Sequence, residues 1–122
     1  MYAYIGYSIP QTDAHMVEEL GKVVERTGLS VEYWHEHQGL QYAFDKVAGC
    51  QLFLVLLTSP SKSKTMSQLY ENAKRLGIMA MLLVEKSVSL HSNLSNDPNV
   101  ISFRRYGSVN PIRSVELKLF GV

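Results

Sequence analysis

Two unbroken apolar segments constrain this chain more than any other feature of its sequence. Residues 52–57 read Leu-Phe-Leu-Val-Leu-Leu, and residues 78–84 read Ile-Met-Ala-Met-Leu-Leu-Val. A strand with one face in water alternates apolar and polar side chains, whereas an inner strand of a parallel sheet is covered by helices on both faces and is apolar throughout. The two segments therefore predict neighbouring inner strands that run in the same direction.

Shorter elements alternate regularly around these two strands. Further strands are predicted at residues 2–8 and 29–34 and, from a weaker pattern, at 100–103. Apolar residues three and four positions apart predict four amphipathic helices. Their inner stripes are Met16, Leu20, Val23 and Val24; Leu40, Ala43, Phe44 and Val47; Leu69, Ala73 and Leu76; and Ile112, Val115 and Leu119.

Five strands that alternate with four helices predict a single α/β domain over residues 1–122. The expected architecture is a flavodoxin-like three-layer sandwich with a five-stranded parallel sheet in the strand order 2-1-3-4-5. Thr12 or Asp13 is the expected N-cap of the first helix, and Asn110 that of the last. Cys50 and the methionines, including Met79 and Met81, are expected to pack in the core.

The composition favours a soluble protein of a reducing compartment. A chain of 122 residues with 46% hydrophobic side chains is long enough to bury a core without disulfides. The formal net charge of +1 disfavours nucleic acid and anionic membranes as partners. The N-terminus lacks the basic region of a signal peptide, and a single cysteine excludes a disulfide framework. We therefore expect a cytoplasmic protein.

Ligands of this fold bind beyond the carboxyl ends of the strands, near the reversal of strand order between the first and third strands. That rule selects residues 7–11, 35–37 and 58–63. No glycine-rich phosphate loop follows the first strand, which disfavours ATP hydrolysis and Rossmann-type dinucleotide binding. Aromatic rings can stack on a base, and hydroxyls can bind a ligand hydroxyl or phosphate. The predicted ligand-binding residues are Tyr7, Ser8, Trp34, Thr58, Ser59 and Ser61.

One candidate metal site lies at the end of the second predicted strand. His35 and His37 are alternate residues, so their imidazoles share one face of an extended chain, with Glu36 between them. Zinc sites need at least three protein ligands, and no third one is obvious. We therefore predict no metal and no resident cofactor.

Several segments together resemble a known family. They are Tyr4-Ile5-Gly6-Tyr7-Ser8 followed by Asp13; Trp34; Leu40, Ala43, Val47 and Cys50; Leu57-Thr58-Ser59-Pro60; and the helix with Ala73 and Gly77. In this order, over residues 2–86, they resemble Toll/interleukin-1 receptor (TIR) domains and are similar to nucleoside 2-deoxyribosyltransferases. The resemblance implies the same α/β fold and a nucleotide- or nucleoside-related ligand. It also implies a homo-oligomer or a TIR-type protein partner.

One position in the third helix decides what the resemblance implies for catalysis. Enzymes of both families cleave an N-glycosidic bond, in NAD or in a deoxynucleoside, with a glutamate early in the third helix. The matching residue here is Leu69, and Glu71 follows two positions later, turned about 200° around the helix. The resemblance thus implies a binding or protein-interaction module without the family's glutamate. The alternative is a small N-glycosidase or deoxyribosyltransferase in which Glu71 is the catalytic carboxylate.

Overall fold

The computed structural model describes residues 1–7, 10–34, 38–59, 63–86, 88, 94, 97–104 and 110–121, with only the backbone at 10–13 and 63. Strands and helices alternate along this part of the chain as far as the fourth strand. They are β1 (Tyr2–Tyr7), α1 (Pro10–Glu25), β2 (Ser30–Tyr33), α2 (Leu40–Gly49), β3 (Leu52–Leu57), α3 (Ser63–Arg75), β4 (Met79–Glu85), β5 (Val100–Phe103) and α5 (Pro111–Phe120).

The strands form one parallel sheet in the order β2-β1-β3-β4-β5. The two apolar segments are inner neighbours, as predicted, with Leu52 opposite Met79 and Leu57 opposite Val84. All six residues of β3 are buried, because the strand is covered on both faces. The flavodoxin-like α/β fold predicted from the sequence is confirmed.

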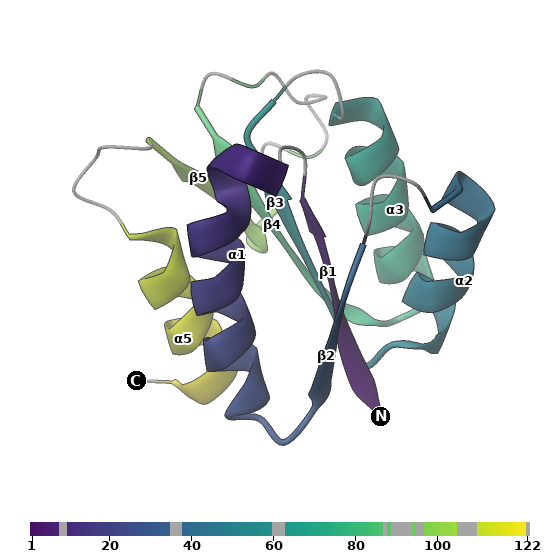
Figure 1. Ribbon diagram of the computed structural model, residues 1–122, viewed down its shortest axis with the longest axis horizontal. Helices are drawn as coiled ribbons and strands as arrows, with labels where there is room; N and C mark the ends of the chain where they lie inside the picture. Colours follow the sequence, from purple (N-terminus) through teal and green to yellow (C-terminus); the bar gives the residue numbers. More distant parts are fainter. Residues whose placement is uncertain are drawn as a thin grey trace.

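Helices cover both faces of the sheet, with α1 and α5 on one side and α2 and α3 on the other (Figure 1). Successive side chains of a strand point to opposite faces, so each strand contributes to two cores. Ile5 and Leu54 pack in the core beneath α1 and α5. Tyr4 and Phe53 pack in the core beneath α2 and α3, where their rings stack with centroids 6.0 Å apart.

The N-cap predicted for α5 is confirmed, and the one predicted for α1 is wrong. Asn110 caps α5 as predicted, and its Oδ1 accepts a hydrogen bond of 3.0 Å from the backbone N–H of Ile112. The prediction of Thr12 or Asp13 as the first N-cap was wrong, because α1 already begins at Pro10. Proline suits the first helical position, where its missing N–H would have no partner within the helix.

Leu40, the first residue of α2, was expected on the inner side of that helix but is 45% exposed. Two further apolar side chains that the sequence assigned to the core are exposed. Leu76 follows the last residue of α3 and is 52% exposed, because the chain turns there into Gly77 with a φ of 77°. Met79, the first residue of β4, is 46% exposed. Leu76 and Met79 lie at the amino edge of the sheet. The apolar pattern of the sequence extends to this edge, but the helices do not cover it.

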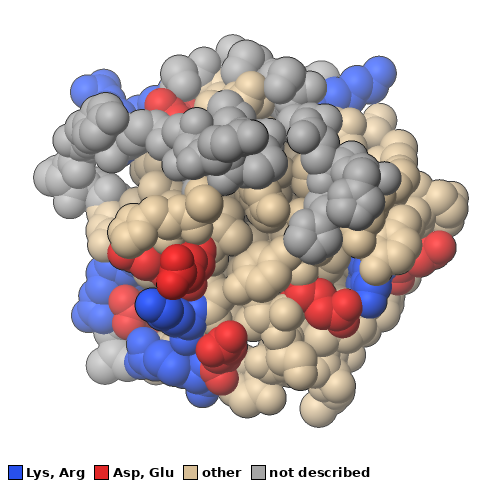
Figure 2. All heavy atoms as spheres, in the orientation of Figure 1, with Lys and Arg blue, Asp and Glu red and all other residues tan. Residues whose placement is uncertain are grey.

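The surface carries no large region of a single charge in the view of Figure 2, where positive and negative side chains lie together over α1 and α5. Arg26 contacts Glu116 at 2.9 Å there, and Lys22 contacts Glu18 at 3.5 Å. None of the helices within the described ranges is both long enough and apolar enough to cross a bilayer.

Candidate functional site

The carboxyl ends of β1, β2 and β3 meet at one edge of the sheet (Figure 1). Tyr7 ends β1 and lies opposite Leu56 of β3, and Thr58 and Ser59 follow β3 directly. On the other side of β1, the backbone N–H of Trp34 donates to the carbonyl of Ile5 at 2.9 Å. The structure thus brings four of the predicted ligand-binding residues to this edge, which we call the carboxyl edge.

The four side chains differ in how far they reach solvent. Trp34 is only 6% exposed and belongs to the core beneath α2 and α3, and Thr58 is also buried. Tyr7 and Ser59 are partly exposed, and each of the four residues has a polar, ring or electrostatic contact. Tyr7 packs against the core beneath α1 and α5, on the other face of the sheet from Trp34. A ligand at the carboxyl edge would therefore meet mainly Tyr7 and Ser59.

The remaining predicted residues of this edge lie outside the described part of the chain. They are Ser8 and Ser61 of the ligand-binding set, and His35, Glu36 and His37 of the metal hypothesis. Among the described residues, no three His, Cys, Asp or Glu side chains are arranged to hold a metal ion.

A close approach of α3 to β1 positions the start of α3 at the carboxyl edge. A Cβ added to Gly6 would lie only 3.2 Å from Sδ of Met66, so glycine lets this buried methionine pack directly over the strand. The burial of Met66 agrees with the core position expected for the methionines, but its contact with Gly6 was not predicted. The signal was present, because a glycine within an apolar strand often marks a close approach of another segment.

Leu69 and Glu71 lie on opposite sides of α3. Leu69 is 1% exposed and packs in the core, whereas Glu71 is exposed, as a separation of two helical residues predicts. Glu71 is also eight residues from the start of α3 at Ser63, a distance of about 12 Å along the helix axis. The structure therefore does not bring Glu71 together with the residues of the carboxyl edge.

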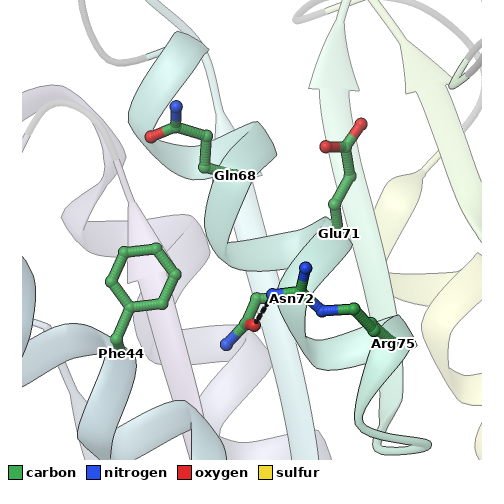
Figure 3. A pocket seen from close by; sticks show the side chains of 5 residues that line it. All are labelled: Phe44, Gln68, Glu71, Asn72 and Arg75. Atoms are coloured by element: carbon green, nitrogen blue, oxygen red, sulfur yellow. Dashed lines mark hydrogen bonds between the residues drawn. The ribbon is translucent and has the colours of Figure 1, made fainter.

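Glu71 instead lines an open pocket of about 450 Å³ on the outer side of α2 and α3. Phe44 of α2 faces α3 at the level of Gln68 and Asn72, while the carboxylate of Glu71 points away from it (Figure 3). Nη2 of Arg75 donates a hydrogen bond of 2.6 Å to Oδ1 of Asn72. The pocket thus combines one aromatic ring with two amides and two opposite charges. Of its lining residues, the sequence analysis had proposed only Glu71 for a site.

A second polar cluster joins α3 to the segment before β5. The carboxylate of Asp97 accepts hydrogen bonds from the Tyr70 hydroxyl at 2.9 Å, from the Lys74 ammonium and from the Asn99 backbone N–H at 2.9 Å. Burial by itself would raise the pKa of Asp97, but Lys74 and these hydrogen bonds outweigh it and lower that pKa. No sequence pattern predicted these contacts.

No family model and no curated protein matches this sequence. Solved structures that share its fold include the following two. The crystal structure of the RPS4 and RRS1 TIR domain heterodimer matches with a TM-score of 0.65 and 10% identity, over 98% of this chain and 96% of that chain. The CMP N-glycosidase BcmB of Clostridium botulinum matches with a TM-score of 0.63 and 17% identity, over 93% of this chain and 98% of that chain.

These similarities define the class of protein. At 10% and 17% identity they establish the fold, and they extend over almost the whole chain. The chain is an α/β domain with the fold shared by TIR domains and deoxyribosyltransferase-like proteins, so the predicted resemblance is confirmed at the level of fold.

Proposed function

We propose that the chain is a TIR-like domain that binds a nucleotide or nucleoside without cleaving its N-glycosidic bond. One observation carries this proposal, namely that Leu69, which matches the family's glutamate, lies in the core with 1% of its surface exposed. Cleavage of such a bond uses a carboxylate that faces the sugar carbon, as a nucleophile or as an electrostatic partner of the developing positive charge. A leucine side chain supplies neither.

The carboxyl edge supports a ligand of this class. The phenol ring of Tyr7 offers a flat face to a base, and the hydroxyl of Ser59 offers a hydrogen bond to a sugar or phosphate oxygen. A protein of the same fold is a CMP N-glycosidase, which favours a nucleoside monophosphate as the first ligand to test. The proposal includes no cofactor, no nucleic acid and no membrane, and it places the protein in the cytoplasm.

Binding is tested by calorimetric titration of the purified chain with CMP, other nucleoside monophosphates, deoxynucleosides and NAD. We expect one class to bind, and we expect Tyr7→Ala and Ser59→Ala each to weaken binding about tenfold, which corresponds to about 1.4 kcal/mol. Lys118→Ala on α5 is the matched surface control and should leave the affinity unchanged. Absence of binding at millimolar concentration of every compound would refute the proposal.

The alternative is an N-glycosidase that uses Glu71, and the shared fold with a CMP N-glycosidase favours it. Chromatography of the same mixtures at high protein concentration measures free base. We expect no release. Release that Glu71→Gln abolishes would replace the binding proposal with this alternative.

A second candidate function is association with another copy of the chain or with a TIR-type domain. The RPS4 and RRS1 TIR domains, which have the same fold, were crystallised as a heterodimer. Sedimentation velocity over a wide range of concentrations tests self-association, and a strictly monomeric chain would contradict it.

A further inference from the structure

We propose that the outer face of α2 and α3 is a dimer interface at which two copies of this chain meet with their α3 helices antiparallel. This inference rests on the second candidate function above and specifies the surface and the partner. The α2/α3 face is defined by Leu40, Phe44, Gln68, Glu71, Asn72, Arg75 and Leu76.

Apolar side chains without full cover lie along this face. Leu40 and Phe44 are four residues apart on α2, so they share one side of that helix. Leu40 and Leu76 are among the exposed large apolar residues of the described chain, and Phe44 is half-buried at the pocket. Leu40 and Phe44 thus form an apolar strip along α2, and Leu76 adds an exposed apolar side chain just after the end of α3.

Two opposite charges on the outer side of α3, those of Glu71 and Arg75, have no ionic partner among the described residues, whereas Lys74 of the same helix pairs with Asp97. Among the described residues Glu71 has no ion pair, and Arg75 bonds only to the uncharged amide of Asn72. Figure 3 shows the Glu71 carboxylate and the Arg75 guanidinium turned away from each other. On α1, by comparison, Lys22 pairs with Glu18 and His15 with Glu19.

These opposite charges are arranged so that the face is complementary to itself. Glu71 and Arg75 are four residues apart, or about 6 Å along the helix, and both lie on the outer side of α3. A two-fold axis perpendicular to α3 at the level of residue 73 places Glu71 of each copy beside Arg75 of the other. A two-fold interface repeats each contact, so two such ion pairs form.

The same operation brings apolar side chains together. Leu76 of the second copy comes to the level of residue 70, and Phe44 lies across from Gln68 and Asn72 at about that level (Figure 3). Leu76 of the second copy would thus enter the pocket that Phe44 lines. The axis that pairs the charges also covers the exposed leucine.

The test is a charge exchange followed by sedimentation velocity. We expect a concentration-dependent dimer for the unmodified chain. Glu71→Arg or Arg75→Glu alone places like charges together, and each should weaken the dimer at least tenfold. The double variant restores opposite charges and should recover the dimer, and an equimolar mixture of the two single variants should form a heterodimer. Lys118→Glu on α5 is the control and should not change the dimer.

The outcomes distinguish a wrong interface from a wrong proposal of self-association. A dimer that tolerates both single reversals would overturn the α2/α3 interface and leave self-association standing. A chain that is monomeric up to millimolar concentration would overturn both. Thermal unfolding of every variant, with midpoints equal to that of the unmodified chain, shows that a lost dimer does not reflect a lost fold. Leu76→Glu should also abolish the dimer, because it places a charge against Phe44.

Discussion

The buried carboxylate of Asp97 should contribute more to stability than any other acidic side chain in the described chain. Its side chain is 5% exposed and accepts hydrogen bonds from Tyr70, Lys74 and the backbone N–H of Asn99. These contacts hold the segment before β5 against α3. The substitution Asp97→Ala would remove all three acceptor contacts at once.

The magnitude follows from what each donor loses. Tyr70 is fully buried, so its hydroxyl would be left without a partner, at a cost of about 1–3 kcal/mol. Loss of the hydrogen bond from Asn99 adds about 1 kcal/mol. The Lys74 side chain is 43% exposed, so its ion pair is screened by water and adds less than about 1 kcal/mol. We expect Asp97→Ala to lower the free energy of unfolding by about 2–4 kcal/mol.

The effect should depend on pH with a definite sign. The pKa of Asp97 in the folded chain lies below its ordinary value of 3.8, so the charged carboxylate stabilises the folded state above that ordinary value. This stability is lost as the pH falls through the lower, folded-state pKa. The difference between the unmodified chain and Asp97→Asn, which never ionises, should therefore be full at pH 6 and shrink below pH 3.8.

Urea denaturation at pH 6 and at several values between pH 4 and pH 2 measures both effects. Asp45→Ala is the matched control, since Asp45 is exposed and its side chain has only one hydrogen bond in the described chain, of 3.0 Å from Gln41, and no ion pair. It should cost less than about 0.5 kcal/mol. Equal losses at the two positions, or an Asp97→Asn effect that does not change with pH, would refute the reasoning.

Three further predictions concern the core. Leu69→Ala should lower the free energy of unfolding, measured in urea, by about 2–5 kcal/mol, because it leaves a cavity in the core. A loss below about 1 kcal/mol would show that Leu69 does not face the core. Gly21→Ala should lower the thermal midpoint, because its Cβ would lie 2.2 Å from the Tyr33 hydroxyl, and Tyr33→Phe should partly rescue it; no rescue would contradict that clash. Burial raises the pKa of Cys50 to about 11, so its thiol should react with a disulfide reagent at pH 8 only after urea unfolds the chain, and rapid labelling of the folded chain would count against its burial.

Local sequence patterns were sufficient to predict the sheet and the order of its elements. The apolar runs of β3 and β4 specify strands covered on both faces, and the apolar spacing of residues such as Ala43 and Val47 specifies helices that cover them. Right-handed connections then leave few strand orders open. These properties depend on neighbours within a few residues, so they can be read from the chain itself.

Contacts between distant segments were decided by the tertiary structure alone. Asp97 bonds to Tyr70, 27 residues earlier in the chain, and Phe44 reaches the pocket beside Glu71 only because α2 and α3 pack on the same face. Leu76 has the spacing of a core residue and is nevertheless exposed. Spacing fixes the direction of a side chain relative to its own helix, whereas burial and partners depend on what the rest of the chain places there.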